Sequence, residues 1–143
     1  WYKLEGVHMR YPIFIEKEQS SDYGVTIPDL QGCFSAGATV DEAILNAEEA
    51  ILTHIEGLLM DEEIVPPPSR VEELKKTFNN QNYIWMLCEI DMNKLSENVK
   101  RINITITEKL LSKIDNFANI EGETRSGFLT HAALEYISKH SFR

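Results

Sequence analysis

The 143-residue sequence contains few cysteines, and it lacks any long hydrophobic run. Cys33 and Cys88 form no CxxC motif and no Cys/His cluster, so neither a disulfide framework nor a zinc site is indicated. No metal-ligand spacing connects the four histidines, which are His8, His54, His131 and His140. No apolar run approaches the roughly 20 residues that span a membrane, and no segment has the basic start and apolar core of a secretory signal. We therefore expect a cytoplasmic protein with no membrane partner, metal or cofactor.

Basic residues are scarce in the first 99 positions. Residues 1–99 contain 7 Lys and Arg against 18 Asp and Glu, a net charge of −11. Residues 100–143 contain 7 against 5, a net charge of +2, which together give the −9 of the whole chain. An acidic half suits a cationic partner and a basic half suits nucleic acid. A well-solvated acidic surface of no special purpose is the alternative.

Alternating and turn-rich segments organise the first 91 residues. Residues 1–8 precede Met9 and are expected to be a leader outside the fold. We predict strands at Tyr11–Lys17, Tyr23–Ile27 and Tyr83–Ile90, and a loop over Pro28–Gly37 that leads into another short strand. A long helix is predicted from Thr39 to about Met60, with Glu42 completing a capping box, and a short helix at Val71–Phe78. Residues 92–99 are polar and indicate a linker.

A short alternating strand is predicted at Arg101–Ile106. Side chains of a strand alternate between its two faces, so Ile102, Ile104 and Ile106 share one face. A lone strand needs a partner, and a second copy of the chain is the expected source. The other face carries Arg101, Asn103 and Thr105, whose side chains are suited to hydrogen bonds with base edges in the major groove. An ordinary edge strand with a solvated face remains the alternative.

Two helices are predicted after this strand, and Gly122 separates them. Thr107 is the expected N-cap of the first helix and Thr124 that of the second. Thr124, Arg125 and Ser126 could hold a DNA phosphate at the free amides of the second helix, although capping alone explains Thr124. This order of strand, helix, turn and helix over residues 100–143 resembles the ribbon-helix-helix (MetJ/Arc-type) superfamily. The resemblance implies a dimer that binds operator DNA.

The N-terminal half carries a second resemblance, between about Tyr11 and Ile90. It rests on the Tyr23-Gly24-Val25 strand, Pro28-Asp29-Leu30-Gln31-Gly32-Cys33, Gly37, Thr39 with Asp41-Glu42-Ala43, Asn46-Ala47 and Pro66-Pro67-Pro68-Ser69. These residues resemble the HicB antitoxin family, in the subgroup that has a ribbon-helix-helix tail. The resemblance implies an N-terminal partial ribonuclease-H-like domain. It also implies that the chain neutralises HicA, a small basic toxin that cleaves mRNA with a histidine, and represses its own operon.

A ribonuclease-H-like scaffold raises the alternative of a nuclease. Two-metal nucleases need several converging carboxylates, and the candidates here are Glu16, Asp29, Asp41 and Asp91. Asp29 lies in a Pro-Asp-Leu turn and Asp41 at a helix start, where acidic residues are favoured without any metal. Cys33 is a better core residue than nucleophile. We therefore predict a nuclease-like scaffold without catalytic residues, that is, no enzyme.

A ligand-responsive repressor without a toxin partner is the remaining alternative. Gly32 and Gly37 could border a small pocket, although turn geometry explains the same glycines. Stabilisation by a small molecule, and by no protein, would favour that function.

The predicted fold class is α+β, with a partial ribonuclease-H-like (HicB-type) α/β domain at residues 9–91 followed by a ribbon-helix-helix domain at residues 100–143 that dimerises. The predicted partners are a HicA-like mRNA interferase, operator double-stranded DNA and a second copy of the chain, with a tetramer left open. The predicted toxin-binding residues are Tyr23, Pro28, Asp29, Gly32 and Phe34.

Overall fold

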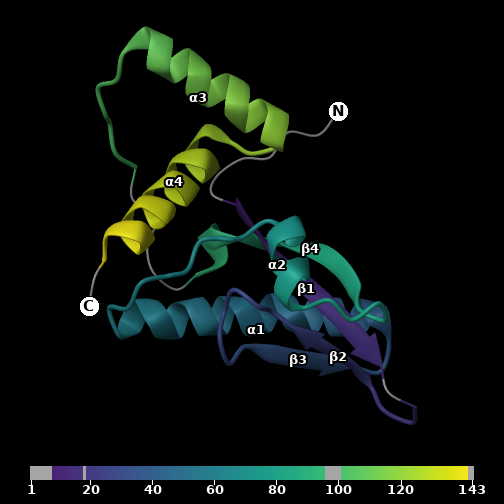
Figure 1. The fold of residues 1–143 in the computed structure, drawn as a ribbon. Helices are drawn as coiled ribbons and strands as arrows, with labels where there is room; N and C mark the ends of the chain where they lie inside the picture. Colours follow the sequence, from purple (N-terminus) through teal and green to yellow (C-terminus); the bar gives the residue numbers. More distant parts are fainter. Residues whose placement is uncertain (1–7, 18, 96–100, 142–143) are drawn as a thin grey trace.

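The structure, a computed structural model, describes residues 8–17, 19–95 and 101–141 (Figure 1). The first half contains four strands and two helices, which are β1 (His8–Lys17), β2 (Tyr23–Thr26), β3 (Phe34–Gly37), α1 (Val40–Met60), α2 (Val71–Thr77) and β4 (Ile84–Asp91). A 3₁₀ turn at Met92–Lys94 follows, and the second half contains α3 (Glu108–Glu121) and α4 (Arg125–His140). The chain therefore has the mixed α and β composition that the sequence predicts.

The four strands form one antiparallel sheet in the order β3-β2-β1-β4. β1 and β2 follow one another in the chain and pair antiparallel, and β4 pairs with the other edge of β1 along eight residues, from His8 opposite Asp91 to Ile15 opposite Ile84. This long ladder explains why β1 begins at His8, earlier than the predicted Tyr11 and inside the expected leader. The hydrogen-bonding partner for its first residues comes from β4, and the local sequence contains no signal of that pairing.

Helix α1 covers one face of the sheet. Thr39 is its N-cap, and the Thr39 hydroxyl accepts a hydrogen bond from the Glu42 amide at 3.1 Å, as predicted. The buried residues of α1 recur at helical spacing and pack against alternate residues of β1; they are Ala43, Ala47, Ile51 and Ile55 on the helix and Met9, Tyr11, Ile13 and Ile15 on the strand. This contact forms the core of the first half.

Gly37, at the end of β3, brings the sheet close to α1. A Cβ added at Gly37 would lie 2.4 Å from the backbone nitrogen of Ala43. The side-chain amide of Asn46, about one turn further along α1, donates a hydrogen bond to the Ala36 carbonyl at 2.8 Å. The edge strand is therefore held against the start of α1, and at Gly37 no room is left for the ligand pocket that the sequence leaves open.

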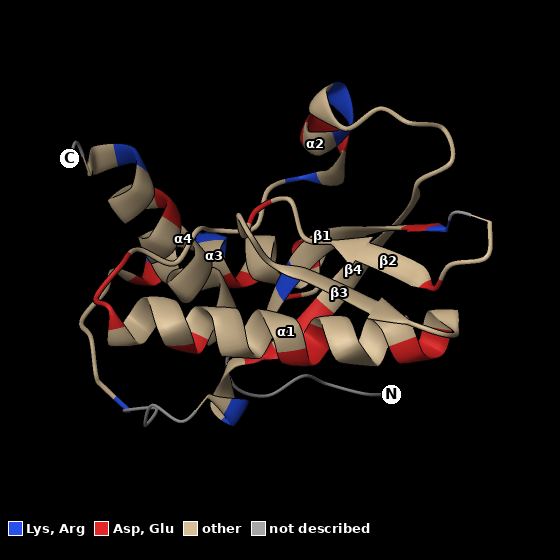
Figure 2. Ribbon diagram, turned by 90° about the horizontal axis from the view of Figure 1, so that it is seen from below, with Lys and Arg blue, Asp and Glu red and all other residues tan. Residues whose placement is uncertain are grey.

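The opposite face of the sheet is only partly covered. Phe14 points to that face, and its ring stacks on Tyr83 at 4.0 Å and contacts the rings of Phe78 and Trp85 at 5.5 and 5.1 Å. Phe78 directly follows α2, which lies on the side of the sheet away from α1 (Figure 2). The cover extends over β1 and β4, and Phe34 on β3 remains 66% exposed.

Both helices of the second half begin where the sequence predicts, and α3 ends at the predicted Gly122. Thr107 accepts a hydrogen bond from the Leu110 amide at 3.3 Å, and Thr124 accepts one from the Gly127 amide at 2.9 Å. Gly122 follows α3 with φ +72°, a left-handed conformation that ends helices and favours glycine. No helix in the described ranges is long and apolar enough to cross a membrane.

The predicted strand at Arg101–Ile106 does not form within the single chain. Residues 101–107 have no regular secondary structure, and Ile102 and Ile104 are 74% and 58% exposed. A strand needs a neighbouring strand for its hydrogen bonds, and no other described segment pairs with this one. Half of the predicted linker, residues 96–99, lies outside the described residues, as does Lys100.

Candidate functional site

The part of the sheet that α2 leaves uncovered forms a surface over β2 and β3. Register places its residues in two rows, one of Glu16, Gly24 and Ala36 and one that ends in Thr26 and Phe34. We call these five residues the open sheet face. Phe34 and Ala36 are exposed, although side chains on the solvated face of an antiparallel sheet are usually polar. A large exposed aromatic beside small residues is typical of a protein-binding surface.

The five predicted toxin-binding residues do not form one surface. Phe34 belongs to the open sheet face, and Tyr23 is half-buried with the Lys17 ammonium 4.7 Å from its ring centroid. Pro28 and Asp29 are half-buried in the turn between β2 and β3, where Gly32 adopts φ +84°. The turn geometry accounts for Gly32, and Phe34 is the one large apolar side chain of the five that is exposed.

Asp29 is engaged inside the fold. Its carboxylate accepts hydrogen bonds from the Ser69 backbone amide at 2.8 Å and from the Ser69 hydroxyl at 2.6 Å. Nearby, the Tyr11 hydroxyl donates to the Pro66 carbonyl at 2.7 Å. Burial raises the pKa of Tyr11, and the negative charge of Asp29 raises it further. Asp29 therefore fastens the Pro66–Ser69 segment to the turn, which explains its presence without a partner.

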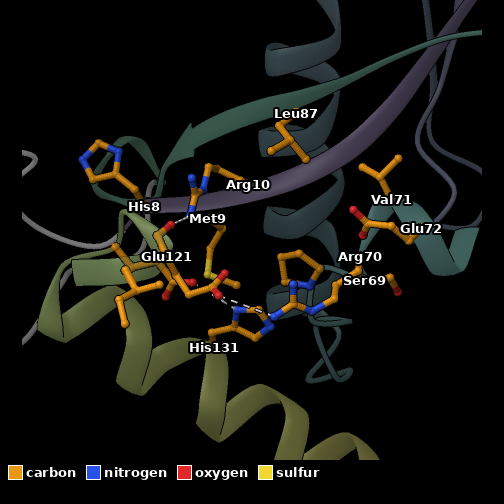
Figure 3. A pocket seen from close by; sticks show the side chains of 13 residues that line it. His8, Met9, Arg10, Ser69, Arg70, Val71, Glu72, Leu87, Glu121 and His131 are labelled. Carbon is orange, nitrogen blue, oxygen red and sulfur yellow. Dashed lines mark hydrogen bonds and ion pairs between the residues drawn. The ribbon is translucent and has the colours of Figure 1, made fainter. Parts of the chain in front are cut away.

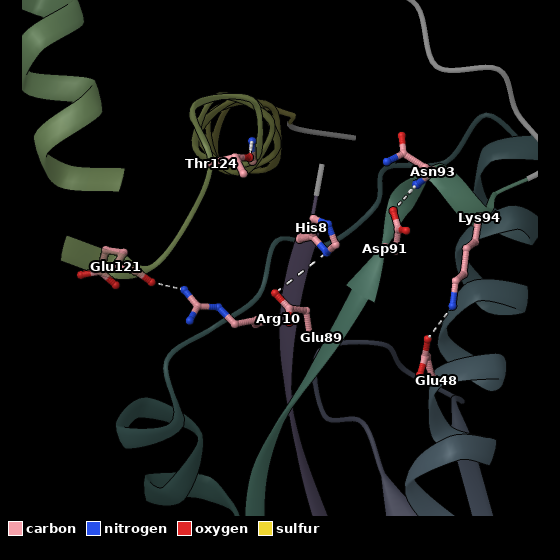
Figure 4. Close-up of polar contacts among 10 residues, drawn as sticks. His8, Arg10, Glu48, Glu89, Asp91, Asn93, Lys94, Glu121 and Thr124 are labelled. Carbon is pink, nitrogen blue, oxygen red and sulfur yellow. Dashed lines mark hydrogen bonds and ion pairs between the residues drawn. The ribbon is translucent and has the colours of Figure 1, made fainter. Parts of the chain in front are cut away.

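Acidic side chains line the outer surface of α1. The helix contains Asp41, Glu42, Glu48, Glu49 and Glu56 and no Lys or Arg (Figure 2). Lys94 approaches this surface, with its ammonium 3.3 Å from the Glu48 carboxylate (Figure 4). Part of the excess of negative charge in the first half therefore lies on a helix that packs against β3.

The carboxylates that a nuclease would need are dispersed. Glu16 lies on β1 and Asp41 at the start of α1, while Asp91 accepts a hydrogen bond from the Asn93 amide at 3.0 Å and Asp29 binds Ser69 (Figure 4). Within the described ranges, no three His, Cys, Asp or Glu side chains are grouped so that they could hold a metal ion. Cys33 and Cys88 are both buried, and burial raises the pKa of each thiol, that of Cys88 to about 11. Such thiols are poor nucleophiles.

The predicted DNA-reading residues precede α3. The side chains of Arg101, Asn103 and Thr105 are all exposed. Seven large apolar side chains of the same half are exposed as well; they are Ile102, Ile104, Leu110, Phe117, Ile120, Tyr136 and Ile137. Only Ile114, Ala118 and Gly127 are buried in the described part of this half. The second half therefore presents far more apolar surface than it covers by itself.

The predicted phosphate-binding turn begins α4. Thr124 is the N-cap, and Arg125 and Ser126 are exposed in the first turn. The Arg125 guanidinium donates two hydrogen bonds to Asp115 on α3, at 2.9 and 2.8 Å, which lowers the pKa of that carboxyl group. Arg125 therefore has a partner in the single chain that a phosphate would have to replace.

The sequence gives no indication of a cleft that lies between the two halves. Its lining comes from β1, the segment before α2, and the region where α3 meets α4, and includes Arg10, Ser69, Arg70, Glu121 and His131 (Figure 3). Arg70 contacts the Glu121 carboxylate at 3.5 Å, and His131 lies 3.8 Å from Glu123. Arg70 and Glu121 are far apart in the chain, so no local pattern could have identified their contact.

Comparisons with known proteins agree with this arrangement. The family described as HicB_like antitoxin of bacterial toxin-antitoxin system matches residues 11–133, which includes both halves. The class is therefore that of bacterial antitoxins. More particularly, the chain belongs to the HicB-like antitoxin family.

Individual relatives match nearly the whole chain. An uncharacterised 14.9 kDa protein of Haemophilus phage HP1 is 42% identical over 127 residues, which are 87% of this chain and 95% of the phage protein. The crystal structure of the Burkholderia pseudomallei antitoxin HicB is similar with a TM-score of 0.68 and 42% identity, over 90% of this chain and 98% of that one. A structure of the HicA3 and HicB3 toxin-antitoxin complex matches with a TM-score of 0.51 and 36% identity, over 58% of this chain and 99% of the matched chain.

Proposed function

We propose that the first half neutralises a HicA-like toxin by covering its RNA-binding surface or its catalytic histidine. The support is the family, together with the similarity to a chain of a HicA3 and HicB3 complex. A toxin that binds RNA presents positive charge, and an acidic partner is complementary to it. Complementary charge speeds encounter and orients the two proteins.

The open sheet face is the proposed contact. Phe34 is 66% exposed there, and this single observation carries the assignment. Exposed aromatic anchors next to small residues frequently dominate the energy of a protein interface. The acidic outer surface of α1 lies on the other side of the sheet, so it contributes long-range negative charge and no direct contact at this face. Asp29, Gly32 and Pro28 act by shaping the turn that precedes Phe34.

A pair of matched substitutions tests this surface. Phe34→Lys places a charge in the proposed interface and should weaken toxin binding about 30-fold or more, in line with loss of an interface anchor. Leu45→Lys is the control, because Leu45 is 64% exposed on α1 and equally apolar. Binding would be measured by calorimetry with a purified HicA-like toxin, and neutralisation by cleavage of a labelled mRNA. Loss of binding in Leu45→Lys alone would move the contact to α1.

The second half is proposed to dimerise and to repress the operon. Seven large apolar side chains are exposed in residues 102–137, and a second copy of this half is the natural cover for them. Pairing of two Arg101–Ile106 segments would give the ribbon that the single chain cannot form, with Ile102, Ile104 and Ile106 between the copies. Arg101, Asn103 and Thr105 would then face the major groove.

Operator binding tests the second half. Asn103→Ala should cost about 1 to 3 kcal/mol of operator affinity and relax sequence preference, since it removes contacts to a base edge. Arg101→Ala should behave alike. Affinity would be measured by fluorescence anisotropy with operator and with scrambled DNA at one salt concentration. Unchanged affinity and selectivity in Asn103→Ala would show that this strand does not read bases.

A further inference from the structure

The end of α3 is held by two arginines of the first half. The Arg10 guanidinium, on β1, donates a hydrogen bond to the carbonyl of Glu121, the last residue of α3 (Figure 4). Arg70 contacts the carboxylate of the same Glu121 at 3.5 Å (Figure 3). The last carbonyls of a helix lack partners within it and carry partial negative charge, so a cation is favoured there. The first half therefore caps a helix of the second.

Gly122 permits this approach. Its φ of +72° ends α3, and a Cβ at this position would lie 3.4 Å from Nη1 of Arg10. Because Gly122 has no side chain, it can adopt the left-handed conformation that ends α3, and it leaves room for the Arg10 guanidinium. The turn between α3 and α4 is in this way brought onto β1.

The start of α4 lies against the same strand. Gly127 is buried, and a Cβ added to it would lie 3.3 Å from the carbonyl oxygen of His8, the first residue of β1. Further along α4, Leu134 packs against the core of the first half. The β1 backbone therefore occupies space beside the first turn of α4, the turn that contains Thr124, Arg125 and Ser126.

We infer that the first half masks the phosphate-binding turn of the second, so that it competes with DNA for this turn. The inference rests on the proposed DNA binding of the second half. Arg125 and Ser126 remain exposed, but the His8 carbonyl lies beside the buried Gly127 in the same turn, so a DNA phosphate bound there would approach this oxygen and the net charge of −11 of the first half. Operator binding therefore requires that Arg10 and Arg70 release Glu121. The apparent affinity is then reduced by the fraction of chains that are docked.

Arg10→Ala in the full chain tests this competition. Removal of a cation ordinarily weakens DNA binding, whereas here we expect about tenfold tighter binding to operator and to scrambled DNA alike, in proportion to the loss of one charge-assisted hydrogen bond. Lys76→Ala is the matched control. It removes one positive charge from the same half, and among the described residues Lys76 pairs with Glu73, within α2. Its DNA affinity should equal that of the wild type or fall slightly below it.

Two further measurements keep the test decisive. If Arg10→Ala fails to fold, Arg70→Ala tests the same competition, because it alters an exposed side chain. Its gain in DNA affinity should be smaller. Hydrogen exchange of the Arg125–Gly127 amides should become faster in both variants. Equal DNA affinities of the wild type, Arg10→Ala and Arg70→Ala would overturn the masking while the DNA function stands. Absence of DNA binding by all of them, at low salt, would overturn the DNA function itself.

Discussion

The Asp29 carboxylate and Ser69 form two hydrogen bonds across 40 residues of sequence, one to the Ser69 amide at 2.8 Å and one to its hydroxyl at 2.6 Å. Together with the hydrogen bond from Tyr11 to Pro66, this contact holds the proline-rich Pro66–Ser69 segment against the first half. The segment leads directly into Arg70 and α2. Asp29 therefore helps to position Arg70, whose guanidinium contacts Glu121.

Loss of the Asp29 contact should destabilise the first half. Asp29→Ala is expected to lower the free energy of unfolding by about 1 to 2 kcal/mol, because a charged acceptor with two donors is removed. Ser69→Ala should have a smaller effect, and the double variant should show coupling of about 0.5 kcal/mol or more. Urea unfolding of the three variants measures the cycle. Strictly additive effects would mean that the two residues act independently in solution.

Gly37→Ala should be far more disruptive than a second glycine substitution. The added Cβ would lie 2.4 Å from the Ala43 nitrogen and 2.8 Å from its Cα, so the strand or the helix must move. We expect a loss of about 1 to 3 kcal/mol. Gly57→Ala is the control, since nothing lies within 4 Å of its added Cβ and alanine favours a helix by about 1 kcal/mol. Thermal unfolding should shift in opposite directions for the two variants.

Substitutions at Arg125 and at its partner Asp115 should change DNA affinity in opposite directions. Arg125→Ala should weaken binding to every sequence and flatten the salt dependence by about one phosphate contact. Asp115→Asn should strengthen DNA binding. The substitution releases the Arg125 guanidinium, which donates two hydrogen bonds to the Asp115 carboxylate. Glu108→Gln removes a negative charge from the same helix without freeing an arginine. An equal gain in Glu108→Gln and Asp115→Asn would mean that net charge alone is responsible.

Alkaline solution should unfold this chain through its buried protonated groups. Burial raises the pKa of Cys88 to about 11, above its usual value of 9.0, so the folded state holds this proton more tightly than the unfolded state. The resulting stability is complete below about pH 9 and is lost as the pH rises towards about 11, and the raised pKa of Tyr11 acts in the same direction. Urea unfolding between about pH 8 and 10.5 measures the slope. Cys88→Ala should reduce that slope, and an unchanged slope would assign it to other groups.

Local sequence signals predicted the helices well and the tertiary contacts poorly. Thr39, Thr107 and Thr124 accept the N-cap hydrogen bonds expected of them, since capping involves residues three apart. The start of β1 was predicted three residues late because its pairing with β4 is a property of the sheet. The contact of Arg10 with Glu121 joins residues 111 positions apart, and no periodicity records it.

The candidate site was predictable only in part. Phe34 is exposed, whereas the carboxylate of Asp29, predicted for the same Tyr23 to Phe34 surface, accepts hydrogen bonds from Ser69 within the chain. A motif residue can be retained for shaping a turn as readily as for touching a partner, and only the geometry distinguishes the two. Contacts with toxin and DNA at the other predicted residues remain predictions.

The scarcity of buried residues in the second half has a consequence for how the chain responds to its own abundance. Among its described residues the second half buries only Ile114, Ala118 and Gly127, so under the proposed dimer it gains stability from a second copy, and its folding becomes bimolecular and follows mass action. Under the proposed dimer, operator occupancy then rises with roughly the square of the antitoxin concentration when the chain is scarce. The first half has its own core and keeps its structure at any dilution. Neutralisation would thus persist at concentrations where repression has already ceased, and transcription of the operon would resume before the toxin is released.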